Sequence, residues 1–429
     1  MSTLLEAFSR QLDARGSLAD IGARRVALAA ALESDLPHAR VEEWKYTSLR
    51  ALERREPSLA SAAVLDDAVI ASMPSPRVVF VNGVYSAAAS DVAALPSGLS
   101  VSVSSDTLPF ELIGAAHAFN QVNAALSEGG VRIHATSAVS SPLHVAWVQT
   151  SDETADVSQH NTHVIKVDDG ASLNIVEHVV STGAHKHLST NRLVVSLGAD
   201  ASMEHVRAQM DSKSSTWIAR TEVTLDRAAN YRRLDLELGA SLSRHELNCT
   251  LIGDEAHVVS NGVLLGDEKR HIDTRLDIMH NALNTSCDLN WRGLGAERSR
   301  IAFHGSIIIA EGADFTEASL SNKNLLLSDN AEIDTQPVLE IYAEEVQAAH
   351  GATVGQLDTN ALFYMQSRGI DATAAKTMLI AAFCHELLSV VEDKPLREWL
   401  GTQLDQSLQG LDLACPRSIG RKSAKIFRR

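Results

Sequence analysis

Gly170-Ala171-Ser172-Leu173 is the first copy of a short unit that decides the fold of this chain. In each copy alanine comes second, a polar residue third and an apolar residue fourth. The later copies are Asp200-Ala201-Ser202-Met203, Ala228-Ala229-Asn230-Tyr231, Glu255-Ala256-His257-Val258 and Asn330-Ala331-Glu332-Ile333. The first four alanines are spaced by 30, 28 and 27 residues. Such a quasi-period, without intervening helices, predicts a parallel β-helix whose coils stack small side chains over one another.

The segment that holds these units also lacks proline. Between Pro142 and Pro337 lie 194 residues without one, and strands that are hydrogen-bonded on both sides exclude proline. Leu234–Leu238 and Ile272–Ile278 place apolar groups on one strand face and polar or charged groups on the other. The unit also appears out of step at Gly239-Ala240-Ser241-Leu242. A β-sandwich would give part of this alternation and is the alternative fold.

Helical patterns flank the strands. Apolar residues follow helical spacing in 4–12 and 21–32, and one helix is expected within the strand region at about 108–127. Past Thr359 the period is helical again, with Asp371 as a helix cap and Pro395 opening a further helix. The apolar stripe of the helix after Asp371 comprises Ala375, Met378, Leu379, Ala382, Phe383, Leu387, Val390 and Val391. We therefore expect a helical domain over 1–75, a strand core over 76–350 and a helical domain over 351–429.

Composition excludes several classes of function. Acidic residues outnumber basic ones by 54 to 38, and the formal net charge of −16 repels nucleic-acid phosphates, so no nucleic-acid partner is expected. The four cysteines contain no C-x-x-C pair, which argues against a disulfide framework or a self-contained zinc or cluster site. The N-terminus lacks a signal-peptide pattern, and no segment holds about 18 uninterrupted apolar residues. We expect a cytoplasmic protein with no membrane partner.

The period of the sequence changes at His350, which lies between Ala349 and Gly351. If the last coils lie near Val338–Tyr342, this histidine lies at the exposed end of the stack, where another chain could add its strands. A neutral imidazole can offer a lone pair to iron, but one histidine alone cannot hold a metal tightly. From the residues alone, a hydrogen-bonded structural histidine and a metal ligand both remain open.

Six motifs taken together point to a family. They are Glu43-Trp44-Lys45-Tyr46-Thr47, Phe303-His304-Gly305-Ser306-Ile307, Asn322-Lys323-Asn324-Leu325-Leu326-Leu327-Ser328, Leu339-Glu340-Ile341-Tyr342-Ala343, His350-Gly351-Ala352-Thr353-Val354-Gly355 and Phe363-Tyr364 through Ser367-Arg368-Gly369-Ile370. On these motifs the chain closely resembles the SufB/SufD family of iron–sulfur cluster assembly proteins, along nearly its whole length. The resemblance implies a mainly β fold, a right-handed parallel β-helix flanked by N-terminal and C-terminal α-helical domains.

The resemblance also implies partners. In this family SufD pairs with SufB, and each binds a SufC ATPase; the chain itself has no G-x-x-x-x-G-K-[ST] loop. SufB carries an essential cysteine shortly before the position of His350, whereas this chain has none between Cys287 and Cys384. The resemblance is therefore to the SufD branch, a non-enzymatic subunit without a tightly bound cofactor. There the matching histidine faces the SufB cysteine, which implies a transient iron or iron–sulfur cluster at that interface.

The family places its ATPase contacts in the C-terminal helices, which implies a partner-binding role for Tyr364, Arg368 and Gly369. Two features depart from the family pattern. Residues 348–349 are both alanine where some members have a cysteine, and Leu320 stands where a polar Gln is expected. Any thiol at His350 must therefore come from another chain.

Two other functions stay open. A β-helix carbohydrate-active enzyme is motivated by Asp273 and Asp277 on one strand face, although such enzymes are usually secreted and rich in groove aromatics, and aromatic content here is 4%. A homodimeric scaffold that acts without SufB fits the same open edge of the stack.

Overall fold

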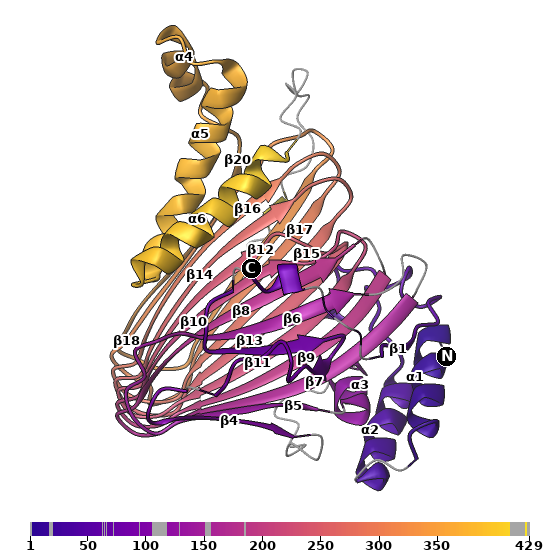
Figure 1. Ribbon diagram of the computed structural model, residues 1–429. Coiled ribbons are helices and arrows are strands. Elements are labelled where there is room, and N and C mark those ends of the chain that lie inside the picture. The colour runs from indigo at the N-terminus through magenta and orange to yellow at the C-terminus, as the bar shows by residue number, and fades with distance from the viewer. Residues whose placement is uncertain are drawn as a thin grey trace.

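The chain folds as a flattened parallel solenoid of about seven turns with helices at both ends, which confirms the predicted fold class (Figure 1). The computed structural model describes residues 2–411, apart from 17–19, 62, 64, 66, 72, 94, 105–117, 128, 151–155 and 184–185, together with residues 425–426.

Two long sheets form the walls of the solenoid, and we name them after the numbering of their long strands. The odd sheet contains β1 (Ser58–Leu59), β4 (Leu99–Ser104), β5 (Gly130–Ala135), β7 (Asp156–Val167), β9 (Lys186–Leu197), β11 (Thr216–Leu225), β13 (Leu242–Leu251), β15 (His271–His280), β17 (Arg300–Ile309), β19 (Glu332–Ile341) and β21 (Lys425–Ile426). The even sheet contains β2 (Arg77–Val81), β3 (Val84–Tyr85), β6 (Leu143–Thr150), β8 (Ser172–Thr182), β10 (Ser202–Met210), β12 (Asn230–Glu237), β14 (His257–Gly266), β16 (Ser286–Gly295), β18 (Thr316–Leu326) and β20 (Val346–Gly355).

Neighbouring strands in each sheet belong to successive coils. The odd sheet has the order β21-β19-β17-β15-β13-β11-β9-β7-β5-β4, with β1 beside β7, and the even sheet has the order β20-β18-β16-β14-β12-β10-β8-β6-β2-β3. The terminal pairs β4–β5 and β2–β3 are antiparallel, and the long strands pair in parallel. The last strand reaches Gly355, beyond the boundary expected at residue 350.

The recurring alanines lie at the corners where odd strands turn into even ones. The first four are at most 1% exposed, and the residue before each has a positive φ, between 53° and 67°. A left-handed residue turns the chain sharply, and the small alanine side chain then fits under the next coil. The out-of-step copy at Ala240 and the fifth copy at Ala331 precede odd strands, so they mark the opposite edge of the solenoid.

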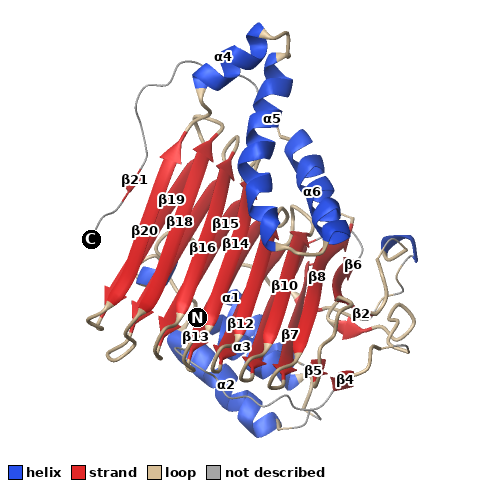
Figure 2. Cartoon of the chain, turned by 90° about the vertical axis from the view of Figure 1, so that its left-hand side faces the viewer, coloured by secondary structure: helices blue, strands red, loops and turns tan. Residues whose placement is uncertain are grey.

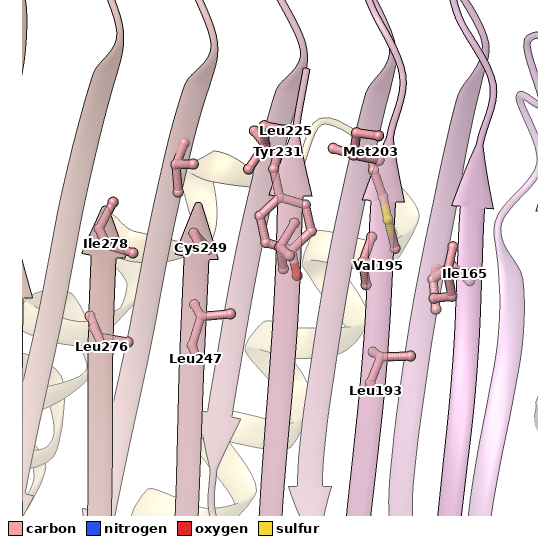
Figure 3. Packing of buried hydrophobic residues seen from close by; sticks show 14 of the residues in the cluster. Ile165, Leu193, Val195, Met203, Leu225, Tyr231, Leu247, Cys249, Leu276 and Ile278 are labelled. Atoms are coloured by element: carbon pink, nitrogen blue, oxygen red, sulfur yellow. The ribbon is translucent and has the colours of Figure 1, made fainter. Parts of the chain in front are cut away.

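Apolar side chains fill much of the interior in rows that follow the strand register. Leu247 lies beside Leu276 and Cys249 beside Ile278 on β13 and β15, and Figure 3 shows these pairs at matching heights on adjacent strands. Each row adds apolar contact from coil to coil, which is how a solenoid builds one continuous core.

The middle of the interior is polar instead. On β12 the inward side chains include Asp235 and Glu237, both 0% exposed, whereas Leu234 and Leu236 belong to an apolar cluster shared with the C-terminal helices. The alternation along β12 was therefore correctly identified, but its polar face lies inside because helices cover its apolar face.

The C-terminal helices are α4 (Thr359–Ser367), α5 (Ala372–His385), the 3-10 helix η3 (Glu386–Val390) and α6 (Lys394–Gln409). Asp371 caps α5 and Pro395 lies in the first turn of α6, as predicted. α5 and α6 lie across the outer face of the even sheet, and α4 stands clear of it (Figure 2). The expected stripe on α5 is partly wrong: Ile380 and Cys384 are buried, whereas Met378 is 53% exposed.

One segment in the described part of the chain, Ala372–Val390, is long and apolar enough to cross a membrane by length and composition. Its mean hydropathy is 1.2, and 28% of it is buried inside the protein. Its buried residues pack on the even sheet, where Asn261 of β14 donates a hydrogen bond to the Leu387 carbonyl at 3.0 Å. Core helices of soluble proteins have the same length and composition, so this segment is weak evidence for a membrane span.

The N-terminal helices α1 (Thr3–Asp13), α2 (Ile21–Ser34) and α3 (Ala118–Leu126), with the 3-10 helix η1 (Glu42–Trp44), lie on the odd-sheet side. The 3-10 helix η2 (Asp67–Val69) instead packs with β2 and β6 on the outer face of the even sheet. Residues 105–117 of the helix expected at 108–127 lie outside the described residues. Trp44 is 1% exposed, and the Arg244 guanidinium lies 3.7 Å from the centroid of its ring. This cation–π contact fastens the N-terminal helices to β13.

Candidate functional site at the open end of the solenoid

His350 lies on β20, the last strand of the even sheet. Its register partner on β18 is Leu320, and no strand within the described residues pairs with the other edge of β20. On the odd sheet, β21 covers β19 only at Asp334 and Thr335. The last coil therefore presents backbone N–H and C=O groups that a further strand could pair with.

The imidazole of His350 shares the inward face of β20. Val346, Ala348 and Val354 pack against the interior core, and side chains two or four residues apart on a strand share a face. His350 follows the same spacing, so it lies over Leu320, which is 2% exposed. His350 itself is exposed, because no further coil of the described residues covers it. Within the described part of the chain it makes no side-chain hydrogen bond, so the ring is available to a ligand.

A layer of buried amides lies directly beneath the last coil. Thr335 Oγ1 donates to Asn322 Oδ1 at 2.8 Å, and Asn324 Nδ2 donates to Asn322 Oδ1 at 2.6 Å. Asn324 also donates to the backbone carbonyl of Thr353 on β20 at 3.0 Å. These bonds hold β20 against β18 and give the mouth of the solenoid a polar wall beside the apolar Leu320.

The cysteines that the structure describes cannot supply a ligand at this mouth. Cys249, Cys287 and Cys384 are buried, at 3% exposure or less. Burial raises the pKa of the Cys287 thiol to about 12, so this thiol stays protonated and unreactive at neutral pH. Cys415 lies outside the described residues.

The three C-terminal residues singled out from the sequence lie at the end of α4. Arg368 donates from Nη2 to the Tyr364 hydroxyl at 3.2 Å, and its guanidinium lies 5.2 Å from the ring centroid. Gly369 has a φ of 86° and ends the helix. Phe363 and Tyr364 are 73% and 60% exposed, and α4 buries none of its residues. The helix thus presents uncovered aromatic rings.

The two aspartates that motivated the enzyme alternative differ in how far the protein covers them. Asp273 is 4% exposed and accepts hydrogen bonds from Thr47 and Arg244, so the N-terminal helices cover it. Asp277 faces His304, whose Nε2 lies 3.8 Å away. Asp273, held in this way, is not available to act as an acid or base on a polysaccharide, whereas the Asp277 side chain is 41% exposed.

Sequence reasoning missed a second cluster of reactive groups, inside the middle coils. Glu177 accepts a hydrogen bond from Trp147 Nε1 at 3.0 Å and lies 2.5 Å from His205 Nε2. Asp235 and Glu237 belong to the same cluster. The signal was present in the alternating charges of β12, but alternation does not tell which face is inside.

Comparison with known proteins identifies the family. Residues 148–383 match the family model described as "SUF system FeS cluster assembly, SufBD core domain". The iron–sulfur cluster assembly protein SufD of Escherichia coli is 29% identical over 88% of this chain and 91% of its own length. A SufBD family protein of Synechocystis is 29% identical over 83% of this chain and 84% of its own length.

SufD of Bacillus subtilis is 27% identical over 65% of this chain and 64% of its own length. The family model covers more than half of the chain, including all coils from β7 to β20. The chain therefore belongs to the SufBD family of iron–sulfur cluster assembly proteins.

Proposed function

We propose that this chain is the SufD-like, non-catalytic subunit of an assembly complex and that it pairs with a SufB-like subunit through the last coil. The observation that carries the proposal is the edge of β20 that no described strand pairs with, with His350 on its inward face. Adding strands of a partner satisfies the exposed backbone groups and encloses the mouth of the solenoid. His350 then lies between two chains.

A transient iron ion or iron–sulfur cluster is the cargo at that interface, and no cofactor is resident. His350 contributes a nitrogen ligand, and a cysteine of the SufB-like subunit contributes the thiolate, because the described cysteines of this chain are buried. A site shared by two chains opens when they separate. That property suits a cluster that must be released to other proteins.

A SufC-like ATPase docks on the C-terminal helices in this proposal. The support is the uncovered aromatic face of α4, where Phe363 and Tyr364 lie next to Arg368, since aromatic and arginine side chains are enriched in interfaces. We place the complex in the cytoplasm, without nucleic-acid or membrane partners, in keeping with the net charge of −16. A homodimer of this chain through the same edge is the competing assembly.

Co-expression with SufB-like and SufC-like subunits tests the proposal. We expect all three to co-purify, and Phe363→Ala combined with Tyr364→Ala to lower recovery of the ATPase at least about tenfold while the SufB-like subunit stays bound. Recovery of this chain only as a homodimer, with neither partner, would contradict the proposal.

His350→Ala in the same complex tests the ligand role. The side chain is exposed, so the complex should assemble unchanged, while iron and sulfide per complex after reconstitution fall several-fold. His38→Ala, which removes an exposed histidine from the N-terminal region, is the control and should leave cluster content unchanged. Equal iron and sulfide in His350→Ala and wild type would remove His350 from the site.

A further inference from the structure

The interior of the solenoid holds a group of metal-binding side chains at the coil formed by β12 and β13. Asp235, Glu237 and His245 each offer one ligand atom, and these atoms all lie within 4.8 Å of one another. All three residues are 0% exposed. The group is separate from the last coil and from His350, and it has no part in the function proposed above.

The two sheets bring these residues together by register. Asp235 and Glu237 are two residues apart on β12 and share its inward face. β13 faces them across the interior, where Ser243 Oγ donates to Glu237 Oε2 at 2.8 Å. His245 lies two residues after Ser243 and so points at Asp235. Parallel pairing on both sides of each strand fixes these positions.

His245 has a ring nitrogen without a partner. Its Nε2 lies 3.2 Å from Thr221 Oγ1 and 3.4 Å from Arg233 Nη2, whereas Nδ1 is buried and makes no hydrogen bond within the described residues. Arg233 Nη2 donates to Asp235 Oδ1 at the shorter distance of 2.9 Å, so we assign the Nε2 hydrogen to the threonine hydroxyl, and Nδ1 then presents a lone pair. A metal-bound histidine normally donates its other N–H in this way. A buried imidazole lone pair and two buried carboxylates in one dry cluster favour a bound cation.

Two buried arginines, Arg207 and Arg233, form ion pairs with the carboxylates. Arg207 Nε lies 3.0 Å from Asp235 Oδ1 and Arg233 Nε 2.6 Å from Asp235 Oδ2, and Arg207 also contacts Glu237. Arg233 Nη2 also donates to Asp235 Oδ1, at 2.9 Å. A carboxylate has about four acceptor positions, so these three bonds leave one position on Asp235 for a metal.

The next coil seals the cluster. Gly262 lies beside Asp235 in the register, and a Cβ atom at position 262 would lie 2.2 Å from Trp291 Cζ3. The indole of Trp291, which is 0% exposed, therefore occupies the space that a side chain at 262 would fill. Two carboxylate oxygens and one imidazole nitrogen, with no thiolate, suit divalent ions of the first transition row rather than copper(I) or a cluster.

From this geometry we infer that Asp235, Glu237 and His245 bind a divalent first-row metal ion such as Mn²⁺, Fe²⁺, Co²⁺ or Zn²⁺ inside the solenoid. The ion bridges β12 of the even sheet to β13 of the odd sheet and braces the middle of the stack. Because the site is closed, the ion enters while the chain folds and then exchanges slowly.

Metal analysis of the full chain tests the site. Cells are grown with added Mn²⁺, Fe²⁺, Co²⁺ or Zn²⁺, and the purified protein is treated with EDTA to remove exposed ions. We expect about one ion per chain in wild type and in His350→Ala. His245→Gln and Glu237→Gln should each lower metal content at least about tenfold. His280→Gln, which changes a histidine that is also 0% exposed but lies on β15, is the matched control and should keep its ion.

Three outcomes overturn the inference. They are wild-type protein with less than about a tenth of an ion per chain for every metal, full metal content in His245→Gln and Glu237→Gln, and equal loss in His280→Gln. If neither cluster variant folds, the absorption spectrum of Co²⁺-grown wild type decides. Weak visible bands alone fit oxygen and nitrogen ligands, whereas an intense near-ultraviolet thiolate band would assign the ion to a cysteine and refute the site.

Discussion

His144 and His178 show what burial does to single titratable side chains in this protein. Nδ1 of His144 lies 2.9 Å from Nε2 of His178 on the outer face of the even sheet, and the His178 ring packs at 5.1 Å against Trp399 of α6. Burial, and then the nearby Arg77, lower the pKa of His144 to about 4. Burial, and then His144, lower the pKa of His178 to about 3. Both rings are therefore neutral in the folded protein at pH 7.

Acid should weaken the packing of α6 through this pair. A histidine whose pKa is lower in the folded protein than its unfolded value of about 6.5 makes the free energy of unfolding depend on pH. That free energy falls as the pH drops below 6.5 and stops falling once the pH is below the folded pKa. For His144, the loss between pH 7 and pH 5 is about 2 kcal/mol. Urea unfolding at both pH values measures it, and His144→Gln should lose about 2 kcal/mol less than wild type over this range. Equal losses in the two proteins would show that His144 does not contribute.

At the scale of elements, the sequence predicted the strands and the corners between them better than it predicted which face of each element points to the interior. The alanine units and the long absence of proline correctly predicted parallel coils, because stacking each corner under the next requires a small residue. The inward direction of Asp235 and Glu237 could not be predicted, since it depends on α5 and α6 covering Leu234 and Leu236. For the same reason Met378 was misplaced: the packing partner of a helix selects its buried side.

Gly262 of β14 tests how tightly successive strands are fitted. Gly262→Ala places a methyl group 2.2 Å from the Trp291 ring, and overpacking of this kind should destabilise the fold by about 1–3 kcal/mol. Gly351→Ala on β20, where nothing lies within 4 Å of the new Cβ, is the control and should stay within about 0.5 kcal/mol of wild type. Denaturant midpoints compare the two. A neutral Gly262→Ala would mean that Trp291 has room to move.

At the scale of the whole molecule, the open end of the stack was predictable and its chemistry was only partly so. The change of period near His350 correctly placed this histidine in the last coil. Its inward direction came from the structure, through the register with Leu320 and the packing of Val346, Ala348 and Val354 on the interior core. The polar layer of Asn322, Asn324 and Thr335 beneath it could not be predicted, because a single polar residue in a strand does not show whether its side chain is buried or exposed.

Amide hydrogen exchange should distinguish the last coil from the middle coils. In the isolated chain, the amides of β20 should exchange faster than those of β14, which is paired on both sides and lies under η3. Binding of the SufB-like subunit should then protect β20 and leave β14 unchanged. Slow exchange of β20 before any partner is added would indicate that a second copy of this chain already covers the edge.

The helix η3 is attached to β12 and β14 rather than to the last coil. A small rotation at this attachment therefore produces a larger displacement of the last coil. Strands in a sheet are about 4.8 Å apart, so the three steps from β14 to β20 span about 14 Å. A turn of roughly 10° about β14 would carry the last coil through about 2.5 Å, close to the length of a metal–ligand bond. A small swing imposed on the C-terminal helices could thus separate His350 from an atom that it touches, without any strand leaving its neighbour.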